Sequence, residues 1–317
     1  MKKFVNKCPI CGSFNTQYFT KTYDRHYGHI DKYYDVYKCK NCFLFFLNPM
    51  ISENELYPMY DPNTYYAYNK FSYKNKNKKV SFSKNFLRII KKILIGIYTR
   101  DPIFHERFTK KVLDFGCGSG SKLYDYKKMG WETYGIEIDK KAAEYGNTLG
   151  LNIFNGSIND AKYPPNFFDY IRSNHSFEHL IDPEVILLEM YRVLKKDGKI
   201  FIGVPNTKSF AFSFFKKYWY YLGVPFHPYS YNIKNLTLLL ERNGFKVIKT
   251  RYVGNYQGLL GSLQIWLNRR NKKKSNKGII AKNMFLKIFF HQIAKILNIF
   301  KIGDCIEIIA VKKRNFL

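Results

Sequence analysis

The sequence has few acidic residues and lacks long apolar runs. Its 317 residues include 24 Asp and Glu against 53 Lys and Arg. No stretch approaches the roughly 20 uninterrupted apolar residues that a membrane-spanning helix needs. A secretory signal pattern is also lacking, because Met1 to Lys3 lead into a polar, cysteine-containing segment. These absences predict a globular protein of the cytoplasm, with reduced thiols.

The shortage of acids leaves a formal net charge of +29. Such a charge favours nucleic-acid or anionic-membrane partners. Lys, Asn, Ile, Phe and Tyr are all abundant together, however, as translation of an AT-rich genome would give. The placement of the lysines is therefore more informative than their total. The length and the 46% hydrophobic content suffice for one α/β domain with attachments.

Two CxxC pairs lie near the N-terminus, at Cys8 and Cys11 and at Cys39 and Cys42, with 27 residues between them. Each pair places two thiolates on one turn, and two such turns complete a tetrahedral Zn²⁺ site. Disulfide pairing is the alternative. Four thiolates would make the site closed and structural, as in a zinc ribbon. Zinc ribbons bind nucleic acid in some proteins and are small metal-stabilised structural modules in others.

The segment after the ribbon is rich in tyrosine and then in lysine. Its first part, 56–68, holds Tyr57, Tyr60, Tyr65, Tyr66 and Tyr68. These rings are expected to cover a cofactor, to stack on a sugar ring or, for most of them, to pack the ribbon onto the main domain.

A polar linker, 70–84, leads into apolar residues at helical spacing over 85–98, interrupted by Arg88, Lys91 and Lys92. This pattern fits a basic amphipathic helix on an anionic membrane or a helix docked on the sheet edge.

A short apolar strand, Lys111 to Phe115, runs into a turn that contains Gly116, Gly118 and Gly120. Glycines permit a tight turn and close approach of backbone to a ligand, and the following helix would direct its free N–H groups at that ligand. The next strand ends in Glu137, where a carboxylate would bind a ribose diol. Ser121 occupies the last position of a G-x-G-x-x-G pattern, so the spacing favours a nucleotide-like cofactor other than a nicotinamide.

These motifs and several that follow resemble class I S-adenosylmethionine-dependent methyltransferases over about residues 110–255. The further matching stretches are Phe168 to Ile171, Phe177 to Leu180, Asp182-Pro183, Glu189, Arg192 to Lys195, Asp197-Gly198 and Val204 to Asn206.

The resemblance implies S-adenosylmethionine as the cofactor and assigns roles around it. Asp114 would lie near the methionine amine, and Glu137 would accept hydrogen bonds from the ribose hydroxyls. Ser157, or Asp160 in its place, would stand near the adenine. Asn174 and the glycines Gly116, Gly118 and Gly120 complete the expected cofactor-binding set.

Strands are expected at 111–115, 132–138, 152–155, 168–173, 199–205, 246–253 and 305–312, with helices in most of the gaps. This alternation predicts a doubly wound α/β sheet. The resemblance implies a seven-stranded, Rossmann-like sheet with the strand order 3-2-1-4-5-7-6 and ligands at the carboxyl ends of strands 1, 2 and 4.

Methyl transfer to a hydroxyl benefits from a nearby base that is neutral at pH 7, and histidine is the usual choice. His179 follows the fourth strand, which by family resemblance faces the transferable methyl. His175 and His227 are the weaker candidates. A purely structural role is the commoner fate of a histidine.

Two further segments interrupt the expected domain. An aromatic stretch, 210–222, and the following Pro225 to Tyr231 form a substrate lid or a core-packing segment. A basic insertion, 258–302, contains a run of Arg and Lys from Arg269 and an expected helix from Ala281 to Ile302. It suits attachment to anionic lipid at roughly 1 kcal/mol per basic residue, or it forms a helical cap or a dimer surface.

The domain boundaries follow as 1–50 for the ribbon, 51–109 for the connector, 110–257 for the core, 258–302 for the insertion and 303–317 for the last strand. The ribbon with Asn48-Pro49 and the tyrosine segment resembles bacterial methyltransferases of sugar and surface-polysaccharide biosynthesis. That narrower resemblance implies O-methylation of a sugar nucleotide or lipid-linked saccharide, in the cytoplasm or at the inner face of the membrane. A methyltransferase of another small molecule such as a quinone precursor, or a nucleic-acid-binding protein with a methyltransferase-like domain, are the alternatives.

Overall fold

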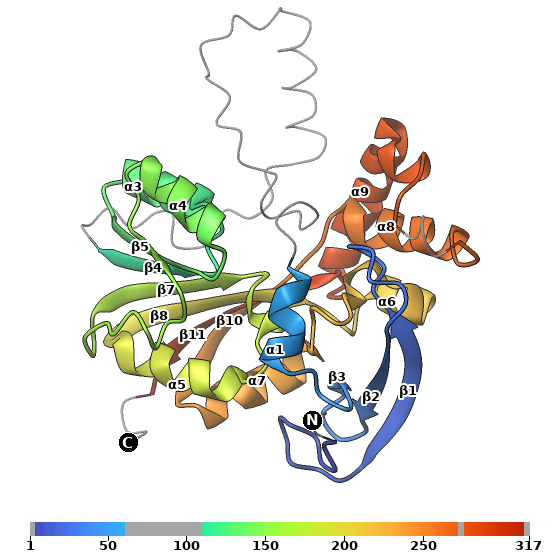
Figure 1. Ribbon diagram of the computed structural model, residues 1–317, viewed down its shortest axis with the longest axis horizontal. Coiled ribbons are helices and arrows are strands. Elements are labelled where there is room, and N and C mark those ends of the chain that lie inside the picture. The colour runs from blue at the N-terminus through green and yellow to red at the C-terminus, as the bar shows by residue number, and fades with distance from the viewer. Residues whose placement is uncertain (1–3, 61–109, 272–275, 314–317) are drawn as a thin grey trace, which may run out of the picture.

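The computed structural model describes residues 4–60, 110–271 and 276–313. Within them the chain forms a large seven-stranded sheet with helices on both faces and a smaller four-stranded sheet beside it (Figure 1). The strands of the large sheet are β4 (Lys111–Phe115), β5 (Glu132–Glu137), β6 (Ile153–Asn155), β7 (Phe168–Asn174), β8 (Leu194–Pro205), β10 (Phe245–Val253) and β11 (Cys305–Lys312).

The large sheet has the order β10-β11-β8-β7-β4-β5-β6. Counted along the chain this is 6-7-5-4-1-2-3, so the expected order is confirmed. Strands β4 to β8 run parallel, whereas β11 is antiparallel to both of its neighbours. Strand β8 begins earlier than expected and takes in Asp197-Gly198, where its register with β7 shifts. The parallel strands bring their carboxyl ends to one edge, which is where ligands bind such sheets.

Helices α3 and α4 cover one face of the large sheet, and α5 and α7 cover the other (Figure 1). Leu123 and Tyr126 of α3, like Leu187 and Met190 of α5, are buried against the strands. The helices of these layers are α3 (Ser121–Lys128), α4 (Lys140–Thr148), α5 (Pro183–Val193) and α7 (Ile233–Arg242). The fold is therefore the Rossmann-like methyltransferase fold with a cysteine cluster near its N-terminus.

The small sheet joins the N-terminal segment to the middle of the chain. Its order is β1 (Thr16–Tyr23), β2 (Tyr33–Cys39), β3 (Phe45–Leu47) and β9 (Tyr229–Ser230). Strand β9 follows the aromatic segment, yet it pairs with β3 through Phe45 and Phe46. The N-terminal module is thus tied by backbone hydrogen bonds to a chain segment that is about 180 residues later in sequence.

Helix α7 also contacts the second cysteine turn. The buried Asn232 caps α7 with its side-chain oxygen, and its Nδ2 donates to the backbone oxygen of Phe43 at 3.0 Å. Asn235 donates to the backbone oxygen of Cys42 at 3.3 Å, and Arg242 donates to that of Ile10. These contacts dock both cysteine turns on the core, and no local pattern in the sequence predicts them.

The aromatic segment folds as α6 (Phe210–Phe215) and two short 3₁₀ turns, η3 (Lys216–Tyr218) and η4 (Tyr220–Leu222). Phe212 and Trp219 are buried in one apolar cluster with Phe45 and Leu47 of β3. Of the two alternatives for this segment, core packing is the one observed. None of residues 210–222 lines the cavity described below.

The insertion forms α8 (Tyr256–Leu267), a 3₁₀ turn η6 (Ile280–Lys282) and α9 (Met284–Ile299). Helix α9 is shorter than the predicted stretch at both ends, and α8 was not anticipated. Two short elements, α1 (Glu53–Leu56) and η1 (Tyr57–Met59), follow the small sheet. The predicted linker 70–84, the predicted helix 85–98 and Tyr65, Tyr66 and Tyr68 lie outside the described residues. In the part of the chain that is described, no helix is both long and apolar enough to cross a membrane.

Candidate functional site

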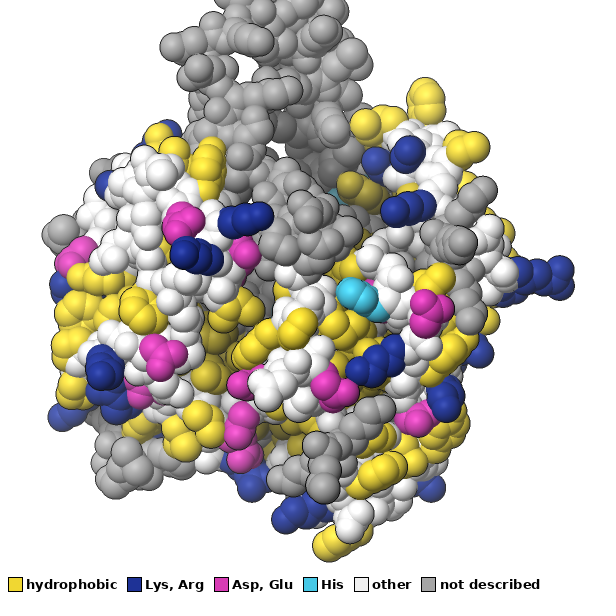
Figure 2. Space-filling view, viewed as in Figure 1, with side chains coloured by type: hydrophobic (Ala, Val, Ile, Leu, Met, Phe, Trp, Pro, Cys, Tyr) yellow, Lys and Arg dark blue, Asp and Glu magenta, His cyan; other side chains and the backbone are white. Residues whose placement is uncertain are grey.

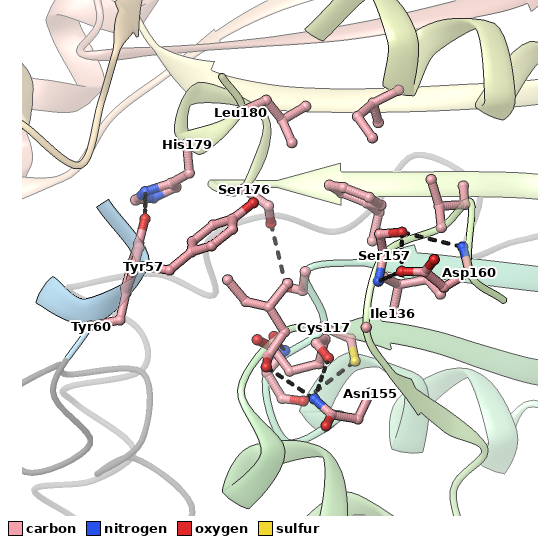
Figure 3. Close-up of a pocket in the computed structure, with 18 of the residues that line it drawn as sticks. Tyr57, Tyr60, Cys117, Ile136, Asn155, Ser157, Asp160, Ser176, His179 and Leu180 are labelled. Carbon is pink, nitrogen blue, oxygen red and sulfur yellow. Dashed lines mark hydrogen bonds between the residues drawn. The ribbon is translucent and has the colours of Figure 1, made fainter. Parts of the chain in front are cut away.

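A cavity of about 800 Å³ opens at the carboxyl ends of β4, β5, β6 and β7. Its volume falls in the range of about 300–1,000 Å³ that is usual for small-molecule sites. Figure 3 shows side chains from widely separated parts of the chain around it, with Tyr57 and Tyr60 on one side and Ser157 and Asp160 on the other. Expected site residues that line it are Gly116, Gly118, Glu137, Ser157, Asn174, His175 and His179.

The turn after β4 is tight because its glycines take positive φ angles. A Cβ added to Gly116 would lie 2.4 Å from Oγ of Ser176, so this position needs the absence of a side chain. Gly118 has a φ of +55°, but no protein atom lies within 4 Å of a Cβ built there. Since Gly118 lines the cavity, the space beside its backbone is free for a ligand.

Glu137 ends β5 with its carboxylate held by two backbone groups. Oε2 accepts from the Gly118 N–H at 2.7 Å, and Oε1 accepts from the Asp139 N–H at 2.9 Å. Burial raises the pKa of Glu137, and the two N–H groups oppose that shift. Each oxygen keeps a second lone pair, so the carboxylate can still accept from a diol.

The end of β6 and the loop after it present polar side chains to the cavity. Ser157 Oγ donates to Oδ2 of Asp160 at 2.6 Å, so both residues considered for the adenine contact stand together. Asn155 Nδ2 donates to the backbone oxygens of Glu137 and Ile138, each at 3.0 Å. Asn155 was not predicted, although its place at a strand end is a signal that would have found it.

Two expected cofactor residues lie away from the cavity lining. Asp114 is buried within β4 and pairs with Arg172 of β7 at 2.8 Å. Gly120 caps α3, and a Cβ there would meet Leu151. Both residues therefore stabilise the glycine turn through packing inside the domain and do not line the cavity. Asn174 does reach the lining, where Gly203 of β8 leaves room for its Oδ1.

His179 lines the cavity from the short turn η2 (Phe177–His179). Its Nδ1 lies 3.1 Å from the hydroxyl of Tyr60, which comes from the segment after η1 (Figure 3). Burial, together with the neighbouring His175, lowers the pKa of His179 to about 4, although a hydrogen bond with the Phe226 backbone opposes the shift. Its imidazole is therefore neutral at pH 7 and is able to accept a proton. Sequence reasoning named Tyr60 but favoured a packing role for most of these tyrosines.

The other two candidate histidines differ in charge and position. Burial disfavours the charged form of His175, but Cys305 and the Glu178 carboxylate, 3.3 Å from Nδ1, outweigh it and hold the pKa of His175 well above its ordinary value. Burial and the adjacent His179 lower the pKa of His227 to about 3. His227 does not line the cavity but stacks edge-on against His179, with ring centroids 4.7 Å apart.

Glu178 is buried next to these histidine rings. It is 1% exposed, and its Oε2 has no hydrogen-bond partner among the described residues. One ligand atom each from Glu178, His179 and His227 lie within 4.8 Å of one another, a set that is also compatible with a metal ion. The histidines and this carboxylate form one polar cluster at the end of the cavity nearest Tyr60.

The four cysteines of the CxxC pairs come together at the base of the small sheet. Their sulfur atoms lie within 4.8 Å of one another, and Sγ of Cys8 and Cys42, like those of Cys11 and Cys39, are 3.5 Å apart. Tetrahedral zinc with Zn–S bonds of about 2.3 Å places its sulfurs about 3.8 Å apart. The spacing therefore fits one zinc ion held by four thiolates.

A protein-family model described as a methyltransferase domain matches residues 79–250, more than half of the chain. The chain is 25% identical to the demethylmenaquinone methyltransferase of Geobacillus sp. (strain WCH70) over 35% of its own length and 52% of that protein. It is 28% identical to the ubiquinone biosynthesis O-methyltransferase of Proteus mirabilis (strain HI4320) over 37% of its length and 48% of that relative. The chain thus spans about half the length of these two relatives.

Among solved structures, an S-adenosylmethionine-dependent methyltransferase from Archaeoglobus fulgidus superposes with a TM-score of 0.48 and 21% sequence identity, covering 72% of this chain and 100% of that chain. A possible histamine N-methyltransferase from Thermotoga maritima gives a TM-score of 0.45 at 17% identity, covering 73% of this chain and 96% of that chain.

Proposed function

The chain belongs to the family of class I S-adenosylmethionine-dependent methyltransferase domains, and we propose that it methylates a hydroxyl of a sugar or sugar-containing intermediate of surface-polysaccharide biosynthesis. The observation that carries the proposal is one cavity that is lined by the glycine turn, Glu137 and His179 together. A nucleotide-binding edge and a neutral base facing the same space are what methyl transfer to a hydroxyl requires.

The residues present fit the cofactor. Glu137 would hold the ribose diol, the free space beside Gly118 would admit the methionine part, and Ser157 with Asp160 would border the adenine. When bound, S-adenosylmethionine supplies an electrophilic methyl group on a positively charged sulfur. The four clustered cysteines would hold a structural zinc ion, which takes no part in the reaction.

At the acceptor side, the neutral His179 accepts the proton that the hydroxyl loses as its oxygen bonds to the methyl carbon. The Tyr60 hydroxyl at Nδ1 and the backbone of Phe226 both form hydrogen bonds with the imidazole and would orient it. Tyr57 faces the same space, pointing toward Ser176 in Figure 3, and would give a sugar ring an aromatic surface. The substrate would be a sugar nucleotide or a lipid-linked saccharide.

The sugar acceptor is supported by the narrower resemblance of the ribbon and tyrosine segment, and by a lining that mixes aromatic with hydroxyl and amide groups. The second candidate acceptor is a quinone precursor. It is favoured by the relatives named for demethylmenaquinone methylation and ubiquinone biosynthesis. Both candidate acceptors would use the same cofactor-binding edge of the large sheet, and they differ only in the chemical group that would lie against His179.

A screen for S-adenosylhomocysteine formation separates the candidates. The purified full chain would be offered sugar nucleotides, lipid-linked saccharides and demethylated quinols, each with S-adenosylmethionine. Turnover on a saccharide that is lost in His179→Ala supports the proposal, whereas turnover on quinols alone overturns the sugar acceptor. Steeply salt-dependent binding to RNA or DNA fragments without any turnover would favour the nucleic-acid-binding alternative.

A further inference from the structure

Helix α9 has two apolar faces, and only one of them is covered by the protein. Phe290, Ile293 and Leu297 pack on the cluster that contains Leu259 of α8, and His291 and Ala294 are buried. This face acts as the intramolecular helical cap that was one of the alternatives for the insertion. The uncovered apolar face needs a separate explanation, because a helix that is hydrophobic on most of its surface is normally buried.

The uncovered face is a stripe made by Phe285, Phe289, Ile296 and Ile299, which are 84%, 59%, 53% and 77% exposed. The successive spacings of four, seven and three residues keep these side chains on one side of a helix with 3.6 residues per turn. Phe300, 69% exposed, extends the stripe at the C-terminal end. We call these five residues the α9 stripe. Contiguous exposed apolar surface of this kind marks an interaction site.

The charge around the stripe is of one sign. Residues 254–303 contain ten Lys and Arg and no Asp or Glu. Lys295 lies on α9, Lys282 lies in the 3₁₀ turn before it, and both side chains are exposed. Figure 2 shows hydrophobic side chains protruding in the region of α8 and α9 at the upper right, with basic side chains beside them.

Trp266, at the end of α8, adds a partly exposed indole to the same region. The guanidinium of Arg269 lies over its ring, 4.4 Å from the centroid. Amphipathic rings of this kind are enriched where apolar and aqueous phases meet. An exposed apolar stripe in a segment that is rich in lysine and arginine and also exposes an indole has the composition of a helix that lies in a membrane interface.

We infer that the α9 stripe docks this protein on an anionic lipid surface, with the phenylalanines entering the acyl boundary and the lysines contacting the headgroups. The charge pattern selects this occupant. A second copy pairing through the same stripe would bring like charges together with no acid in residues 254–303 to neutralise them. A nucleic acid would bind the lysine and arginine side chains but would leave the exposed phenylalanines unexplained. The inference is independent of which acceptor is methylated.

Flotation of the full chain with vesicles tests the inference. The wild type is expected to float with phosphatidylcholine vesicles that contain about one third phosphatidylglycerol, less with phosphatidylcholine alone, and less in high salt. The double variant Phe285→Ser, Phe289→Ser is expected to lower partitioning of the protein onto vesicles by at least about tenfold, because it removes two aromatic rings whose burial in the lipid stabilises binding. The variant Lys282→Gln, Lys295→Gln is expected to weaken binding to anionic vesicles and leave the weak binding to neutral ones unchanged.

A matched control replaces exposed apolar residues elsewhere, with Phe14→Ser and Ile248→Ser, and is expected to float like the wild type. Melting temperatures verify that each variant is folded. Failure of the wild type to float, or equal flotation of the α9 double variant, would overturn the inference. So would a stable dimer that the phenylalanine variant dissociates, or RNA binding that competes with the vesicles. None of these readouts depends on methyl transfer, so the proposed function stands or falls separately.

Discussion

At the scale of single residues, three histidines close together have different protonation states. Cys305 and the Glu178 carboxylate raise the pKa of His175 well above its ordinary value, whereas burial lowers the pKa values of His179 and His227. Of the two neutral rings, only His179 lines the cavity. The local environment thus separates a charged histidine from a neutral one four residues along the chain, and this separation is the physical basis for assigning the base to His179.

Replacing His179 by alanine is expected to lower turnover by about 10²–10⁴-fold, the usual contribution of a positioned base. Affinity for S-adenosylhomocysteine should hold, because His179 contacts none of the expected cofactor residues in the described structure. Tyr60→Phe, which removes only the hydroxyl partner of Nδ1, is expected to cause a smaller loss. Steady-state kinetics and calorimetry measure the two quantities, and a fully active His179→Ala enzyme would exclude the residue as the base.

The pH profile of the wild type follows from the same pKa. A base whose pKa is lowered to about 4 stays deprotonated at all higher pH values, so kcat/KM should decline only as the pH falls toward 4. An unperturbed histidine would produce that decline near pH 6.5. A decline in kcat/KM near pH 6.5 that persists in the His179→Ala variant would point to a different base.

Two glycines with similar backbone angles provide a matched pair. Gly118 and Gly130 have φ angles of +55° and +85°, and a Cβ on either would meet no protein atom within 4 Å. Alanine should therefore cost each position similar backbone strain, of about 1 kcal/mol. Only Gly118 lines the cavity, so Gly118→Ala alone should weaken S-adenosylhomocysteine binding in calorimetry. Equal affinity in both variants would place the cofactor elsewhere.

At the scale of elements, the small sheet depends on the cysteine turns at its end. Replacing Cys39 and Cys42 by serine is expected to abolish a content of about one zinc per chain and to lower the melting temperature, since a zinc ion bound by the four thiolates would tie the two cysteine turns together. Cys117→Ser, outside the cluster, is the control and should keep its zinc. Elemental analysis provides the measurement, and a metal-free wild type that is nevertheless folded would contradict the zinc site.

The elements that were predictable from sequence are those with local signals. Strand β4 is predicted by a short apolar run before the glycine turn. Strand β5 is predicted by its position after a helix-sized gap and by the acid Glu137 at its end. Strand β2 carried an alternation that would also have identified it, with Tyr34 and Val36 buried between more exposed neighbours. Strand β9 carried none, because two residues have no period and their partner strand lies about 180 residues away. Long-range pairing of this kind depends on tertiary contacts.

The site shows the same division. Glu137 ends β5 and His179 follows β7, so motif spacing was enough to predict that both lie at the cavity. Tyr60 could not be assigned, because its contact with His179 spans 119 residues and depends on how the small sheet docks. Asp114 matched a motif position, but its side chain lies inside the sheet against Arg172. A motif gives the strand position, and packing decides where the carboxylate lies.

At the scale of the whole molecule, the two sheets meet at one cavity. The large sheet brings Gly118, Glu137 and His179 to one cavity, and the small sheet, joined through β9 and α7, delivers Tyr57 and Tyr60 to its opposite side. The excess of positive charge is concentrated in part in residues 254–303, which carry ten basic residues and no acid. The proposed acceptor and the inferred lipid surface are compatible, since a lipid-linked saccharide would meet the enzyme at a membrane.

The central claim is that this cavity binds S-adenosylmethionine through the carboxylate at the end of β5. Calorimetric titration of S-adenosylhomocysteine into the wild type, Glu137→Ala and Glu132→Ala tests it directly. Glu132 is the control, an exposed acid at the other end of the same strand. Glu137→Ala is predicted to weaken binding by at least about tenfold, the cost of losing charged hydrogen-bond acceptors, while Glu132→Ala binds like the wild type. Equal affinity of all three proteins would contradict the claim.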